Sequence, residues 1–325
     1  MNAYRISQCL LVLATCFALP TVHGAVGLRS PQGLGQDDST SLRPIAAARQ
    51  AEAPVWRGAA GVPLPFTSYE DIEEFLRTAE VVGRESIPVG VTGPVKVTLE
   101  KDGVRTHAVF RHFKHTYQRA RMGDGRLRLN LTDSYAFEPA AYALARMLGM
   151  DCVPPAVVRH IRGRRGSLQI WVYDAVMERD LPEAGVVRLD RQAGDDSPDR
   201  TPPDTVVWAR QQQMVTLFDE LIGNDDRNGG NLLIDPQWKV WLIDHTRSFY
   251  GRASISGLDS VIFVNRGFWQ RLQQLEKDQL HEALGDYLTG SQIKLILRRR
   301  ERLAELIDGL LQQFGEDAVL YDSWG

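Results

Sequence analysis

The segment 224–249, which reads NDDRNGGNLLIDPQWKVWLIDHTRSF, constrains the chain more than any other part of the sequence. It places Asp226 and Asn231 at the two ends of a loop that contains two adjacent glycines, and Asp244 follows two short apolar runs. Glycine adopts positive φ angles without steric cost. We therefore expect the loop to bend sharply and to direct the side chains of Asp226 and Asn231 toward one point.

The apolar runs predict a β-hairpin. Residues 232–234 and 240–243 have the composition of two short buried strands, and Asp-Pro-Gln at 235–237 is typical of a turn. A hairpin of this length returns Asp244 to the side of Asn231. Converging Asp and Asn oxygens suit Mg²⁺, which proteins bind through one or two carboxylates together with substrate phosphates. The remaining carboxylate is then free to accept or orient the proton of an incoming hydroxyl group.

This division of roles matches phosphoryl transfer, in which a catalytic-loop Asp acts as base and a catalytic-loop Asn and a later Asp bind the metal. The spacing from Asp226 to Asn231 equals that of the D-x-x-x-x-N portion of the protein-kinase loop. Because the Arg follows the Asp here, the segment resembles the N-x-D-R-x-x-x-N-x-L and I-D pattern of the atypical protein kinases. These include phosphatidylinositol 3/4-kinases, HipA-type bacterial kinases and the secretory-pathway kinases of casein-like proteins or xylose.

The resemblance covers about residues 90–249. The additional stretches E-x-x-A-Y-x-L, V-P-P and G-S-L-Q-x-W look like those of an exported bacterial subgroup of the HipA and secretory-kinase relatives. The resemblance implies a bilobal α+β fold, with a β-rich N-lobe over residues 65–173 and a mainly helical C-lobe over residues 174–325. It also implies ATP and Mg²⁺ as cofactors.

Residue by residue, the resemblance assigns the catalytic loop. Asp226 is expected to be the base, and Asn231 and Asp244 are expected to be the metal ligands. Arg227, the second catalytic-loop residue, is expected to anchor the loop to a carboxylate or to backbone carbonyls, with Asp225 as one candidate partner.

The nucleotide side of the site is expected in the N-lobe. A glycine loop at 90–94, with Gly90 and Gly93, leads into antiparallel strands at 95–99 and 106–113, as in a lobe that covers nucleotide phosphates. No Walker A motif occurs in the chain. A plain hairpin would give the same pattern.

Two residues compete for the phosphate-gripping position. Arg111 falls where the V-A-I-K strand of kinases has Lys, and Lys114 points to the opposite face unless a bulge intervenes. A helix that opens at 132–134 matches the αC helix and places Glu138 as the partner of that residue. A first-turn Glu favoured by the helix dipole is the alternative for Glu138. Val172, at the start of a hinge, is expected to meet the adenine.

The remaining elements are expected as follows. A helix capped by Ser68 and another over 204–222 are predicted, and residues 117–128 are expected to form a loop. Three amphipathic helices are expected at 269–275, 277–287 and 291–314, with the arginine-rich run at 298–302 on a solvated face.

Residues 1–24 have the features of an export signal. Arg5 precedes an apolar segment at 9–22 that is too short to span a bilayer comfortably, and small residues allow cleavage before Ala25. We therefore expect an exported protein, periplasmic or secreted, with no transmembrane segment after signal removal. Residues 25–64, rich in Gly, Ser, Pro, Gln and Ala, are expected to form a flexible linker.

Composition sets further limits. The 325 residues include 43% hydrophobic residues, ample for a sizeable core, and a net charge of −3 gives no reason to expect a nucleic-acid partner. Cys152 is the one cysteine left after signal removal, so the exported protein cannot form an internal disulfide.

The sequence thus predicts an exported Mg-ATP-dependent kinase that transfers phosphate to a hydroxyl of a protein, glycan or lipid. One alternative is a nucleotide-binding pseudokinase, favoured by the Arg at the Lys position. Another is a calcium-binding loop of the EF-hand type at 224–235, in which Asn224, Asp226, Asn228, Gly229 and Asp235 take positions one, three, five, six and twelve. Capping of turns by Asp and Asn is a third, and nucleotidyl transfer would use similar groups.

Overall fold

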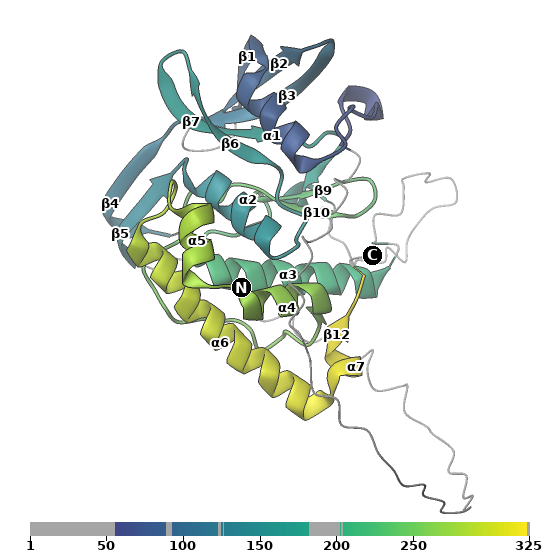
Figure 1. Cartoon of the computed structure of the whole chain (residues 1–325), viewed down its shortest axis with the longest axis vertical. Coiled ribbons are helices and arrows are strands. Elements are labelled where there is room, and N and C mark those ends of the chain that lie inside the picture. Colours follow the sequence, from purple (N-terminus) through teal and green to yellow (C-terminus); the bar gives the residue numbers. More distant parts are fainter. Residues whose placement is uncertain are drawn as a thin grey trace, which may run out of the picture. The chain divides into compact units, whose positions relative to one another are not determined.

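The computed structural model describes residues 56–88, 93–122, 125, 127–181, 202 and 204–323. The predicted export signal, most of the predicted linker and Gly90 lie outside these residues. Most of the strands lie in the first half of the described chain and most of the helices in the second half (Figure 1). The α+β prediction is confirmed.

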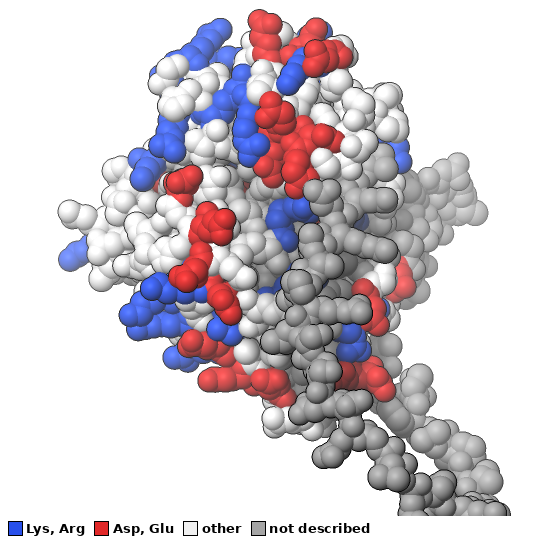
Figure 2. Space-filling model, in the orientation of Figure 1, with Lys and Arg blue, Asp and Glu red and all other residues white. Residues whose placement is uncertain are grey.

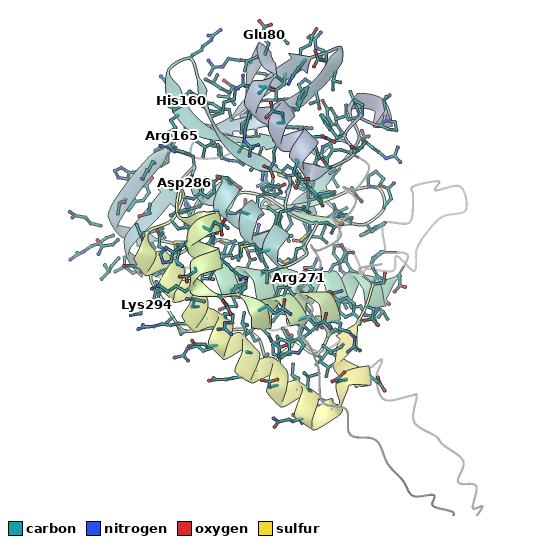
Figure 3. All side chains as sticks on the ribbon, in the orientation of Figure 1. Glu80, His160, Arg165, Arg271, Asp286 and Lys294 are labelled. Carbon is teal, nitrogen blue, oxygen red and sulfur yellow. The ribbon has the colours of Figure 1, made fainter. Side chains whose placement is uncertain are left out.

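A five-stranded antiparallel sheet has the strand order β1-β2-β3-β7-β6. Its strands are β1 (Glu80–Ser86), β2 (Val95–Lys101), β3 (Val104–Arg111), β6 (Ala156–Ile161) and β7 (Arg164–Ile170). Asp102 and Gly103 both have positive φ, 51° and 77°, which matches the twist that a two-residue hairpin turn needs. The side chain of Glu80 extends outward from the start of β1 (Figure 3).

One core cluster joins this sheet to α1 (Tyr69–Thr78), which a Ser68–Asp71 capping box opens as predicted. Ile72 and Leu76 of α1 are fully buried in it. They share the cluster with buried side chains of β2, β3 and β7, namely Val97, Leu99, Ala108, Phe110, Leu168 and Ile170. Burial of this apolar surface holds the helix on the sheet.

A second and larger cluster lies among the helices. The helices are α2 (Phe137–Met147), α3 (Thr205–Ile222), α4 (Arg266–Gln274), α5 (Lys277–Leu284), α6 (Gly290–Phe314) and α7 (Glu316–Val319). Two short strands, β11 (Val264–Asn265) and β12 (Leu320–Tyr321), pair in parallel beside them. The helices predicted at 204–222 and in the last sixty residues are therefore confirmed.

The predicted hairpin is also present. β9 (Leu232–Ile234) pairs with β10 (Val240–Leu242), and β8 (Val176–Met177) adds a third strand beside β9. Short 3-10 turns occur at Ala59–Gly61 and, directly after β8, at Glu178–Asp180.

The predicted loop at 117–128 is wrong. Residues Lys114–Arg121 form β4 and Leu127–Ser134 form β5, an antiparallel pair outside the main sheet (Figure 1). The helix predicted to open at 132–134 begins instead at Phe137. β4 is largely exposed and polar, so it lacks the apolar alternation that signals a half-buried strand, whereas β5 does alternate, with Leu127, Leu129 and Leu131 separated by polar residues.

The surface carries both signs of charge. In the view of Figure 2, basic and acidic groups are interspersed over the visible face. None of the described helices is both long and apolar enough to cross a membrane.

Arg299 corrects the expectation that the arginine run of α6 lies on a solvated face. Its neighbour Arg298 is exposed, whereas Arg299 is fully buried. The Arg299 guanidinium donates to the carbonyl oxygens of Leu221 at 2.7 Å, Arg252 at 2.6 Å and Tyr250 at 3.3 Å. Burial lowers its pKa to about 10. Arg299 therefore ties α6 to the end of α3 and to the segment after residue 249.

We expect Arg299→Met to lower the free energy of unfolding by about 2–4 kcal/mol, because buried carbonyl groups would lose a charged donor. Arg298→Met, the matched control on the exposed face, should change it by less than about 0.5 kcal/mol. Urea denaturation measures both values. Equal midpoints for the two variants would contradict the structural role given to Arg299.

Candidate active site

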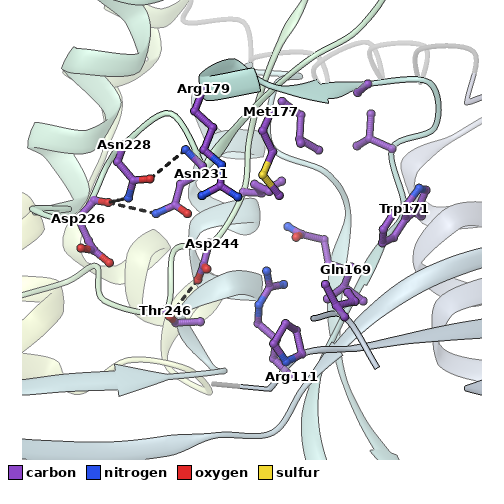
Figure 4. A pocket seen from close by; sticks show the side chains of 18 of the residues that line it. Arg111, Gln169, Trp171, Met177, Arg179, Asp226, Asn228, Asn231, Asp244 and Thr246 are labelled. Atoms are coloured by element: carbon purple, nitrogen blue, oxygen red, sulfur yellow. Dashed lines mark hydrogen bonds between the residues drawn. The ribbon is translucent and has the colours of Figure 1, made fainter. Parts of the chain in front are cut away.

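A cavity of about 700 Å³ lies between the five-stranded sheet and the segments around β9 and β10. This volume is within the range of small-molecule sites. Residues of β3, β7 and the segment after β7 form one wall, and residues 226–247 form the opposite wall. Figure 4 shows Asp226, Asn231 and Asp244 on one side, facing Arg111 and Gln169 on the other.

The structure brings the three residues predicted for chemistry together. Asp226, Asn231 and Asp244 all line the cavity. The backbone N–H of Ile243 donates to the Asn231 carbonyl at 3.2 Å, so Asp244 follows directly on a residue paired with Asn231. The return of Asp244 to Asn231 by the hairpin is confirmed.

Positive φ angles, the predicted reason for two glycines in the loop, are not what the structure shows. Gly229 and Gly230 are absent from the described residues that have positive φ. A Cβ on Gly229 would lie 3.0 Å from the backbone nitrogen of Arg179, and one on Gly230 would lie 3.0 Å from the Arg179 guanidinium. Both glycines therefore allow the turn after β8 to approach closely, and the contact of Gly229 with backbone is the harder one to relieve.

The oxygens at Asn231 and Asp244 suit a divalent cation. The Asn231 side-chain amide donates to the Asp226 carbonyl at 3.1 Å, which leaves its Oδ1 as the free polar atom. Asp244 Oδ1 accepts a hydrogen bond from Thr246 at 3.0 Å. Among the described residues, no group of three or more His, Cys, Asp or Glu is arranged around one point. These two residues would thus hold Mg²⁺ only together with ligand oxygens, such as those of phosphates.

The Asp226 side chain is partly buried and forms an ion pair with Arg247. Its Oδ2 accepts a hydrogen bond from Nη1 of Arg247 at 3.1 Å. Burial raises the pKa of Asp226 above its usual value; the Arg247 charge offsets part of the rise, and nearby Asp244 adds to it. A raised pKa favours a carboxylate that takes up a proton during a reaction.

Arg227 points away from the cavity. Its guanidinium forms two bonds to Asp219, at 2.8 and 2.9 Å, and donates to the carbonyls of Asn231 at 2.6 Å and Ile243 at 2.8 Å. The predicted anchoring by a carboxylate and carbonyls is confirmed, but the partner is Asp219. The suggested partner Asp225 instead bonds to Arg128 and Arg252.

Glu138 is fully buried and links three elements. Arg111 of β3 lies 3.7 Å from it, and His245 donates its backbone N–H at 3.0 Å and contacts it with Nδ1 at 3.1 Å. Burial alone would raise the pKa of Glu138, but the Arg111 charge and the His245 hydrogen bonds outweigh it and lower the pKa to about 2. The predicted Arg111–Glu138 pair is present.

The geometry separates Arg111 from Lys114. Arg111 is buried and lines the cavity, and its Nε and Nη1 have no hydrogen-bond partner in the described part of the chain. Lys114 starts β4, is exposed and is absent from the described lining of the cavity. Buried donors without partners are uncommon, so Arg111 fits an anionic ligand.

Two further predicted positions lie at the edge of the cavity. Val172 lines it beside Trp171. Gly93, with φ of 61°, precedes the lining residue Pro94. Gly90 lies outside the described residues, so its predicted role stays a prediction.

The oxygens of the suggested calcium loop serve other partners. Asn224 accepts from the backbone of Asp226, Asn228 accepts from Gly230, and Asp235 accepts from the backbone of residues 237 and 239 and from Trp241. These side chains cap turns individually. Their geometry does not favour a calcium site.

Sequence reasoning missed Arg179, Arg247, Asp133 and Gln169, all of which line the cavity. Arg247 stands three residues after Asp244, and that proximity could have identified it. Asp133 lies on β5, which the sequence did not predict.

No protein-family model matches the chain. Over 123 residues it is 32% identical to Protein Rv2133c of Mycobacterium tuberculosis, a match that covers 33% of this chain. The match spans 44% of the length of that relative.

Solved structures are similar over a larger share of the chain. Hydra Fam20 with sugar has a TM-score of 0.55 at 15% identity, covering 78% of this chain and 92% of that one. The Golgi casein kinase has a TM-score of 0.54 at 16% identity, and its Mn/ADP-bound form has 0.53 at 16%; each covers 78% of this chain and 80% of that one. At such identities the likeness concerns the fold alone: the fold of this chain is similar to those of hydra Fam20 and the Golgi casein kinase.

Proposed function

We propose that the chain is a phosphotransferase that moves the γ-phosphoryl group of Mg-ATP to a hydroxyl group. One observation carries the proposal. Asp226, Asn231 and Asp244 line the same cavity as Arg111, whose buried Nε and Nη1 have no hydrogen-bond partner among the described residues. This arrangement supports a match to the phosphoryl-transfer template, with Asp226 as the proposed base, Asn231 and Asp244 as the proposed metal ligands and Arg111 as the proposed phosphate-binding cation.

The cavity also has apolar lining residues that could contact a nucleotide base. They are Val109, Ile170, Val172, Leu233 and Ile243. Arg111 would hold phosphate oxygens, and the buried Glu138 keeps its guanidinium in place. Asn231 and Asp244 would hold Mg²⁺, which neutralises phosphate charge when bound.

The acceptor is proposed by class. The likeness to proteins described as a casein kinase and as Fam20 with sugar supports a protein or glycan hydroxyl, and a lipid hydroxyl has the same chemistry. The Mn/ADP-bound neighbour supports nucleotide and divalent metal as ligands. Export, inferred from residues 1–24, is part of the proposal and would place the acceptor outside the cytoplasm.

Asp226→Ala and Asp244→Ala should each lower phosphoryl transfer from labelled ATP by at least about 100-fold, because one removes the base and the other a metal ligand. Asp308→Ala, on the exposed face of α6, is the matched control and should retain full transfer. Equal transfer by all three variants would refute the proposed function.

Arg111→Met should weaken binding of Mg-ADP by at least about tenfold, since it removes the buried cation that faces the cavity. Lys114→Ala should leave that affinity unchanged. Titration with a fluorescent ADP measures both, and circular dichroism checks that Arg111→Met is folded despite the unpaired Glu138. A loss confined to Lys114→Ala would show that the phosphate site was assigned to the wrong residue.

A nucleotide-binding pseudokinase is the second candidate, favoured by Arg at the position where kinases have Lys. Release of ADP from Mg-ATP distinguishes the pseudokinase from the phosphotransferase. Stabilisation by Mg-ATP without any release of ADP supports the pseudokinase, and ADP release that Asp226→Ala abolishes supports the phosphotransferase.

A further inference from the structure

Phosphoryl transfer needs positive charge close to the transferring group, because negative charge is spread over its oxygens in the transition state. The catalytic loop 226–231 does not supply it. Its one basic residue, Arg227, bonds to Asp219 and to backbone carbonyls and is absent from the described lining of the cavity. Besides the proposed Mg²⁺, any side-chain cation next to the base therefore comes from another part of the chain.

Of the described residues that line the cavity, three are arginines: Arg111, Arg179 and Arg247. Arg111 lies 3.7 Å from Glu138, on the wall opposite the loop. Arg179 lies against Gly230, in the turn after β8. Arg247 alone among them bonds to Asp226, with Nη1 at 3.1 Å from Oδ2.

Arg247 is held rigidly. Its Nε donates at 3.0 Å to Asp133, a carboxylate that is 1% exposed on β5. The backbone N–H of Ser134 donates to the Thr246 carbonyl at 2.8 Å, which fixes the chain next to Arg247. A donor held in place before the reaction needs no reorganisation during it.

The third guanidinium nitrogen remains available. Nε and Nη1 of Arg247 are engaged by Asp133 and Asp226, and Nη2 has no hydrogen bond to another described residue. The side chain is 27% exposed and lines the cavity. Nη2 is therefore an available donor on the same guanidinium group whose Nη1 lies 3.1 Å from the proposed base Asp226.

We infer that Arg247 is a further catalytic residue of this site: Nη1 orients Asp226, and Nη2 binds an oxygen of the phosphoryl group in transfer. The inference rests on the proposed function. An acceptor hydroxyl bonded to Asp226 would lie about 2.6–3.2 Å from the carboxylate, with the phosphorus about 3–3.5 Å beyond it. Because Nη1 lies 3.1 Å from Asp226 Oδ2, the inference places the acceptor hydroxyl and the phosphoryl oxygen beside the same guanidinium group.

The step balances as follows. The acceptor oxygen forms a bond to the γ-phosphorus, and its proton passes to the Asp226 carboxylate. The bond from the γ-phosphorus to the β,γ-bridging oxygen breaks, and ADP leaves with that electron pair. Arg247 gains and loses no proton; it stabilises the charge on the phosphoryl oxygens throughout.

The test measures ADP release from Mg-ATP, which counts transfer to water, to the chain itself or to an added protein acceptor alike. Arg247→Ala should lower kcat by at least about 100-fold, as expected for loss of a transition-state donor, while the Kd for fluorescent ADP changes by less than about threefold. Arg247→Lys, which keeps the charge but not the forked geometry, should retain more activity than Arg247→Ala. Added guanidinium at millimolar concentration should restore part of the kcat of Arg247→Ala.

Arg105→Ala, which removes an exposed arginine of β3, is the control and should retain full activity. Full kcat in Arg247→Ala, with an active unsubstituted chain, overturns this inference and leaves the proposed function intact. Loss of kcat with equal loss of ADP binding, and no rescue by guanidinium or in Arg247→Lys, also overturns it in favour of a structural role. Absence of ADP release from the unsubstituted chain overturns the proposed function and this inference together.

Discussion

The geometry of the cavity depends on one buried guanidinium, that of Arg227. It bonds to Asp219 within α3 and to the carbonyls of Asn231 and Ile243, which stand just before β9 and just after β10. One group thus joins the helix, the loop and both ends of the hairpin. The Arg227 side chain is only 12% exposed, and an almost buried charge without partners is costly, so separating these segments would leave the guanidinium unpaired at a cost in stability.

A buried carboxylate performs the corresponding role on the opposite wall. Glu138 of α2 contacts Arg111 of the main sheet and His245 of the segment that carries Asp244. His245 follows Asp244 at the position where the D-F-G motif of common kinases has Phe. Its polar side chain can therefore contact Glu138 of α2 directly. The sheet, α2 and the predicted metal ligand are consequently held by one network rather than by three separate contacts.

The parts of the site that sequence reasoning found are those built from neighbouring residues. The Asp226, Asn231 and Asp244 arrangement spans nineteen positions and follows from a short hairpin with a clear apolar pattern. The β4–β5 pair was missed because β4 is exposed and lacks that pattern, although β5 carries an alternation of Leu127, Leu129 and Leu131 with polar residues. Asp133 of β5 was missed for the same reason, and its contact with Arg247 joins residues that are far apart in sequence.

Two predictions were wrong: the exposure of Arg299 and the partner of Arg227. Arg299 stands three residues after Ile296 and four before Leu303, so the helical period of α6 places it on the buried face. Adjacency in sequence suggested Asp225 as the partner of Arg227, but the helical residue Asp219 takes that place. A short distance in sequence therefore did not predict which charged side chains form ion pairs.

The contact between the turn after β8 and the glycine loop has a consequence for movement. Arg179 donates its backbone N–H to Gly229 at 3.0 Å, and β8 pairs with β9, so this turn belongs mechanically to the wall that carries the loop. The backbone N–H of Trp171 donates to the His107 carbonyl of β3 at 3.0 Å, so residue 171 still belongs to the main sheet. Any rotation of the sheet relative to that wall would therefore change the backbone angles of residues 172–175, where Asp174 has a φ of 59°.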